Sequence, residues 1–155
     1  MVMPCNSAHV FLQQIRDSVH IPVLSIVDET IRTLCDRVPD AVRVGLMATP
    51  AVVKTKLNEN PLLERGIATL APTERSQQLL GEAIYSVKAG DRGPEVTAQV
   101  KTVAQELILG GAEALLLACT EIPLVLGPED IDVPVLDTLE VLALAAVREA
   151  RATST

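Results

Sequence analysis

The sequence predicts an α/β protein in which a parallel sheet is flanked by helices. Short aliphatic runs such as RVGLMAT and VPVLD are typical of buried strands, and they alternate with stretches of helical periodicity. In PEVTAQVKTVAQELILGG, for example, the apolar residues Val96, Val100, Val103 and Leu107 recur at helical spacings. An alternation of this kind indicates parallel strands joined by crossover helices.

The individual elements follow from the same pattern and from the turn residues between them. Strands are expected close to residues 22–27, 42–47, 67–71, 113–118 and 133–136, and helices close to residues 8–19, 28–38, 50–59, 74–88, 94–109 and 138–151. Pro94 suits the first turn of a helix, and Gly110 with Gly111 suits a helix end. Asp137 or Thr138 can cap the last helix.

The chain divides into a complete and an incomplete part. Residues 41–137 contain strands with their crossover helices and form one α/β lobe. The C-terminal helix, residues 138–152, carries LEVLALAAV and is apolar on almost every side, which indicates burial on most of its surface. Residues 1–40 are too short to cover it, so we expect them to be the remnant of a first lobe, completed by helix 138–152, with Met1 inside a strand.

Composition narrows the classes of function. A length of 155 residues with 48% hydrophobic and 21% charged residues is that of one globular domain. The net charge of −7 leaves no basic patch for phosphates, and Phe11 and Tyr85 are the only aromatic residues, which argues against nucleic acid and anionic membranes as partners. No apolar run has the length of a membrane span, and the N-terminus does not resemble a secretion signal, so a cytoplasmic location is expected.

Two of the three cysteines lie in matching settings. VMPCNSAH and LLLACTEIP each place an apolar run before the cysteine and a hydrogen-bonding residue, Asn6 or Thr120, after it. The residue that follows a buried parallel strand lies where ligands bind, so Cys5 and Cys119 are expected to face clefts. Thiol and thiolate on opposite sides of a carbon centre can invert it, because one group removes a proton and the other returns one.

Other interpretations of these residues exist. Each thiol could instead be a buried, inert cysteine, which is the expectation for Cys35 in the middle of a helix. His9 lies close enough to Cys5 to suggest a metal site, but no second pair of ligands accompanies them, and no C-x-x-C motif is present. Neither a metal centre nor a disulfide framework is therefore predicted.

The motifs MPCNSAH, GLMAT, IYSVKAG and LLLACTEIPL, spread from Val2 to about Val147, together resemble the aspartate/glutamate racemase family, in particular its aspartate racemase branch. The resemblance implies a pseudo-symmetric isomerase of two α/β lobes that works without pyridoxal phosphate or any other cofactor. It makes Cys5 and Cys119 the catalytic acid/base pair, one from each lobe, and it implies a homodimer for a full-length protein.

The resemblance also assigns substrate-binding roles. Side chains that would hold the substrate carboxylate and amino groups are Asn6, Ser7, Thr49 and Thr120. Lys88 would reach the substrate side chain or support the site, and Glu121 stands where glutamate racemases usually carry histidine, which favours aspartate. From the residues alone, Lys88 could be a solvated lysine at a helix end and Thr49 a helix cap.

The sequence departs from the family pattern in three ways. Ser7 replaces the usual threonine, Ala118 replaces the usual glycine, and roughly the first third of a family member is absent, including an arginine for the distal carboxylate. The expected function is a racemase that interconverts L- and D-aspartate. The alternatives are an inactive truncated fragment that at most binds a partner, or a related enzyme: a glutamate, broad-specificity or hydantoin racemase, a maleate isomerase or an arylmalonate decarboxylase.

Overall fold

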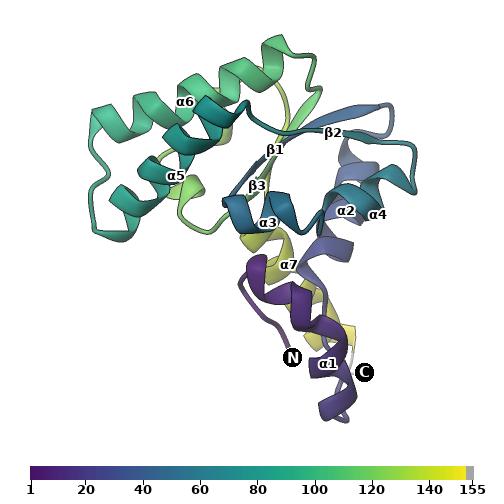
Figure 1. The fold of residues 1–155 in the computed structure, drawn as a ribbon. Helices are drawn as coiled ribbons and strands as arrows, with labels where there is room; N and C mark the ends of the chain where they lie inside the picture. Colours follow the sequence, from purple (N-terminus) through teal and green to yellow (C-terminus); the bar gives the residue numbers. More distant parts are fainter. Residues whose placement is uncertain (153–155) are drawn as a thin grey trace.

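The fold is a parallel sheet between two layers of helices, described by a computed structural model for residues 1–152 (Figure 1). Within these residues the sheet has four strands in the order β2-β1-β3-β4. The strands are β1 (Arg43–Ala48), β2 (Ala68–Leu70), β3 (Ala114–Ala118) and β4 (Val135–Asp137). The predicted α/β class is confirmed.

The two central strands are aliphatic because both of their faces are covered. Every residue of β3 is buried, and β1 is buried after Arg43. Their parallel register runs from Val44 opposite Ala114 to Ala48 opposite Ala118. Both strands therefore stop at the same edge of the sheet, where ligands bind in folds of this kind.

One face of the sheet is covered by α5 (Glu74–Lys88) and α6 (Pro94–Leu109), which lie side by side (Figure 1). The periodic residues of the α6 sequence are buried, as predicted, and pack in one cluster with Leu115 and Leu117 of β3. Pro94 is the first residue of α6. Gly111, just after the end of α6, has a φ of 94°, a conformation that favours glycine.

The other face is covered by α2 (Ile26–Arg37), α7 (Thr138–Ala152) and the short helices α3 (Pro50–Lys54) and α4 (Glu59–Leu63). Ile31 and Leu34 of α2 pack with Leu116 of β3 and Leu142 of α7 in a second buried cluster. Helices from both ends of the chain thus share a core with the sheet. The assignment of residues 1–40 and 138–152 to a first lobe stays a prediction.

The strand expected at residues 22–27 is wrong. Residues 22–25 form no strand, and Ile26 is already the first residue of α2. The Ser25 hydroxyl accepts a hydrogen bond from the Asp28 amide at 3.0 Å, and acidic residues fill the first turn, so N-capping outweighs the apolar run. Met1 also lies outside any strand, although its carbonyl accepts a hydrogen bond from the Leu24 amide at 3.0 Å.

Two of the expected helices are interrupted. The segment 50–59 is broken between α3 and α4, where Lys56 has a φ of 53°. The segment 8–19 begins as a 3₁₀ turn, η1 (Ser7–Phe11), and continues as α1 (Leu12–Ser18). Two further 3₁₀ turns, η2 (Ile122–Leu124) and η3 (Pro128–Asp130), connect β3 to β4.

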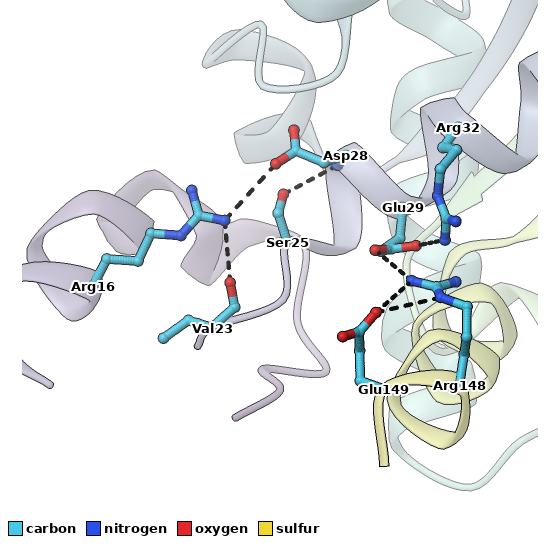
Figure 2. Close-up of polar contacts among 8 residues, drawn as sticks. All are labelled: Arg16, Val23, Ser25, Asp28, Glu29, Arg32, Arg148 and Glu149. Atoms are coloured by element: carbon cyan, nitrogen blue, oxygen red, sulfur yellow. Dashed lines mark hydrogen bonds and ion pairs between the residues drawn. The ribbon is translucent and has the colours of Figure 1, made fainter. Parts of the chain in front are cut away.

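The N-terminal segment lies beside α7, away from the sheet (Figure 1). Polar contacts at the surface connect both α7 and α1 to α2 (Figure 2): Arg148 of α7 donates to Glu29 of α2 at 3.0 Å, and Arg16 of α1 lies 3.9 Å from Asp28 of α2. Ion pairs at a protein surface contribute little to stability. None of the helices within residues 1–152 is long and apolar enough to span a membrane.

Candidate active site

A cavity of about 130 Å³ opens at the edge of the sheet where β1 and β3 end. Every residue that the sequence singled out for the site lines this one cavity, together with Ala118: Cys5, Asn6, Ser7, Thr49, Lys88, Cys119, Thr120 and Glu121. Thr49 and Cys119 follow the paired strand ends directly, which explains why they meet. Cys5 reaches the same cavity from the N-terminal segment and is exposed, whereas Cys119 is buried.

The Cys119 thiol is held in its protonated form. Burial is the main cause that raises the pKa of Cys119 to about 12, and the hydrogen bond that its thiol donates to Glu121 Oε2, at 2.9 Å, adds to the effect. The same carboxylate oxygen accepts a hydrogen bond from the Thr120 hydroxyl at 3.1 Å. In this geometry Cys119 is a proton donor, and its proton points toward a carboxylate.

Glu121 is kept charged by its neighbours. Burial alone would raise its pKa, but the hydrogen bonds from Cys119 and Thr120 and the charge of Lys88 together outweigh burial and lower it. Lys88 Nζ lies 3.9 Å from Glu121 Oε1 and 5.9 Å from the centre of the Tyr85 ring. A single chain of polar contacts therefore runs from the surface lysine to the buried thiol.

Two buried polar atoms in the site have no hydrogen-bond partner within residues 1–152: Asn6 Oδ1 and Thr49 Oγ1. The Asn6 amide nitrogen is already used, because it donates to Thr138 Oγ1 at 2.9 Å. Thr49 is the residue before α3, yet its side chain makes no capping hydrogen bond, so the helix-cap interpretation of its hydroxyl is not supported. Since buried polar groups are normally paired, these two lining residues each keep an unused hydrogen-bonding atom.

Thr138, which the sequence suggested only as a helix cap, lies behind the cavity lining and contacts Asn6. Its hydroxyl accepts from Asn6 and donates to the Leu117 carbonyl at 3.0 Å, two residues before Cys119. The side chain thus connects the loop of one cysteine to the strand of the other. The sequence offers no signal for this contact, because Asn6 and Thr138 are 132 positions apart.

Comparison with known proteins decides the family. A sequence profile described as Asp/Glu/Hydantoin racemase matches residues 1–146. The chain belongs to this family. The resemblance stated from the four motifs is therefore confirmed.

Individual proteins similar to this chain are also amino-acid racemases or homologues of them. This chain is 26% identical over 147 residues to the broad specificity amino-acid racemase RacX of Bacillus subtilis. The aligned region covers 95% of this chain and 63% of RacX. The Picrophilus torridus aspartate racemase has 27% identity and a TM-score of 0.82, over 96% of this chain and 61% of that one. An aspartate racemase homologue from Pyrococcus horikoshii OT3 shares the fold at 22% identity, with a TM-score of 0.83 over 97% of this chain and 66% of that one. The chain thus spans between 61% and 66% of the length of these three proteins.

The contacts of His9 do not support a metal site formed by Cys5 and His9. The His9 Nε2 atom accepts a hydrogen bond from the Ile26 amide at 3.0 Å, and Nδ1 lies 2.8 Å from the Cys5 carbonyl oxygen, so both ring nitrogens are engaged by the backbone. Within the described residues no three side chains of the types His, Cys, Asp and Glu gather as a metal site. Cys35 lies on α2, outside the cavity.

Proposed function

We propose that this chain is a cofactor-independent racemase that interconverts L- and D-aspartate with Cys5 and Cys119 as its two bases. One observation carries the proposal: Cys5 from the N-terminal segment and Cys119 from the end of β3 line one cavity, whose lining also includes Asn6 and Thr49, each with an unpaired side-chain oxygen. A polar pocket between two thiols suits a small polar substrate whose central carbon exchanges a proton.

The two thiols differ in a way that suits opposite roles. Cys5, as thiolate, takes the proton from the α-carbon, and the electron pair of the broken C–H bond is delocalised into the substrate carboxylate. Cys119 donates its thiol proton to the opposite face and becomes a thiolate. In the reverse direction the Cys119 thiolate takes the proton and the Cys5 thiol returns one to the opposite face. Glu121 Oε2 then accepts the hydrogen bond of the reprotonated Cys119 thiol.

The remaining lining residues would bind the substrate. Asn6 Oδ1 accepts a hydrogen bond from the substrate ammonium, since it is a pure acceptor. The hydroxyls of Ser7 and Thr49 donate to the α-carboxylate, and Lys88 attracts the side-chain carboxylate of aspartate. The Thr120 hydroxyl, which donates to Glu121 Oε2, accepts from the substrate ammonium. Cofactor independence is part of the proposal, because the cysteine pair accounts for both proton transfers.

A broader substrate range is the second candidate. The relative that covers 95% of this chain is described as a broad specificity amino-acid racemase, and a glutamate racemase from Deinococcus radiodurans is 28% identical over 129 residues. We also propose a cytoplasmic location and, for a protein of the relatives' length, a homodimer. If the chain proves inactive, it acts at most as a binding module.

The test is chiral chromatography of L- and D-aspartate, L-glutamate and L-alanine after incubation with the purified chain. Cys5→Ala and Cys119→Ala should each abolish racemisation, because neither thiol reaches both faces of the α-carbon. Cys35→Ala is the matched control and should leave the rate unchanged. More than a few per cent of activity in either site variant, with a normal circular dichroism spectrum, contradicts the two-base assignment.

A further inference from the structure

His9 is a buried histidine whose two ring nitrogens bridge separate parts of the backbone. Only 4% of the residue is exposed. Nε2 accepts from the Ile26 amide at 3.0 Å, and Nδ1 lies 2.8 Å from the Cys5 carbonyl oxygen. A backbone N–H can only donate, so Nε2 carries the lone pair, and the proton is on Nδ1, from which it is donated to Cys5.

The bridge connects an exposed loop to the buried start of a helix. Ile26 is the first residue of α2 and is fully buried in the core, whereas Cys5 belongs to an exposed loop that has no strand partner. The residue after Cys5, Asn6, is anchored to Thr138 at 2.9 Å. The chain at Cys5 and Asn6 is therefore held at two points, by His9 to α2 and by Asn6 to α7.

We propose that His9 is a positioning residue: its neutral imidazole, protonated on Nδ1, bridges the Cys5 carbonyl and the Ile26 amide and holds the Cys5 thiol at the cavity. The catalytic consequence rests on the proposed function, in which Cys5 is a base. The bridge itself does not depend on that function.

Protonation of His9 would break the bridge. An imidazolium carries N–H groups on both nitrogens, so its Nε2–H would face the Ile26 N–H, two donors without an acceptor. Burial, the largest influence, lowers the pKa of His9 and keeps the ring neutral; the hydrogen bond to Cys5 and the charge of Asp28 on α2 oppose this, and the charge of Arg16 on α1 supports it. Arg16 and Asp28 lie 3.9 Å apart and partly offset each other (Figure 2).

The experiment combines NMR on the histidine-labelled chain with kinetics. The Nδ1–H tautomer is expected for His9 at neutral pH, with an Ile26 amide protected from solvent exchange. In His9→Ala the Ile26 protection is lost and the amide signals of Cys5 and Asn6 shift. In His9→Asn the side-chain amide, like Nδ1, reaches the Cys5 carbonyl and restores the Cys5 signal. His20→Asn changes an exposed histidine and is the matched control.

Kinetics measure the catalytic consequence. Misplacement of the base should lower kcat about tenfold or more in His9→Ala, with KM nearly unchanged and partial recovery in His9→Asn. An Nε2–H tautomer, or Cys5 signals that do not respond to His9→Ala, overturns the bridge. Shifted Cys5 signals with an unchanged kcat overturn the positioning role. If the wild-type chain shows the bridge but racemises nothing, the proposed function fails while the bridge stands. Should His9→Ala not fold, the wild-type tautomer and His9→Asn still decide.

Discussion

Replacement of Glu121 by glutamine should make the Cys119 thiol more acidic. Glu121 accepts the thiol hydrogen bond at 2.9 Å and adds a negative charge beside it, and both effects favour the protonated thiol. Glutamine keeps the size and an acceptor oxygen but removes the charge. The Cys119 pKa should therefore fall in Glu121→Gln.

The size of the effect is bounded by the structure. With a pKa of about 12 instead of the ordinary 9.0, about one Cys119 thiol in a thousand is ionised at pH 9, where an ordinary cysteine is about half ionised. Burial is the larger cause and remains in the variant. The midpoint in Glu121→Gln should consequently lie between 9.0 and 12.

The assay is the thiolate absorbance near 240 nm during a pH titration, in a background where Cys5→Ala and Cys35→Ala leave Cys119 as the only cysteine. Glu95→Gln, which removes a charge from the exposed start of α6, is the matched control and should not move the midpoint. An unchanged or higher midpoint in Glu121→Gln would refute the stated role of Glu121.

Three further predictions concern stability. Gly45→Ala should destabilise the fold by about 1–3 kcal/mol in denaturant unfolding, because the added Cβ would meet Leu115 Cδ2 at 2.6 Å; a neutral result contradicts the tight β1–β3 packing. Thr138→Val should cost about 1–3 kcal/mol by leaving the Leu117 carbonyl and the Asn6 amide unpaired, whereas the exposed Thr102→Val should cost less; equal losses refute the bridging role. Folding raises the Cys119 pKa, so the contribution of its protonated thiol to the free energy of unfolding is present below pH 9 and is lost as the pH rises toward 12. The free energy of unfolding of wild type should therefore fall relative to that of Cys119→Ser between pH 9 and pH 12. A difference that stays constant over this range argues that folding does not raise the pKa of the thiol.

The sheet was predictable because each of its strands is a short aliphatic run that can be recognised from neighbouring residues alone. Aliphatic runs such as Ala114–Ala118 indicate buried strands. Pro94 and Gly110 mark the two ends of helix α6, which precedes this strand. The errors arose where local signals compete. At residues 22–27 the apolar run suggested a strand, but Ser25 caps a helix there and no neighbouring strand is available for pairing within the described residues.

The cysteine pair was predictable because both thiols repeat one sequence context. Lys88 came from the family resemblance alone, and its contact with Glu121 is a product of the fold. The connections that hold the site together were not predictable. Asn6 meets Thr138 across 132 positions, and the partner of the His9 ring, the Ile26 amide, is a backbone group that no side-chain pattern reveals.

The central claim is that Cys5 and Cys119 exchange the α-proton of an amino acid, and hydrogen exchange tests it most directly. The chain is incubated with L- or D-aspartate in D₂O, and the α-proton signal is followed by NMR, with the double variant Cys5→Ala, Cys119→Ala as the blank. The account predicts loss of the α-proton signal above the blank, with deuterium on the α-carbon of the opposite enantiomer. Exchange at the level of the blank from a folded chain, or equal exchange in the double variant, would contradict it.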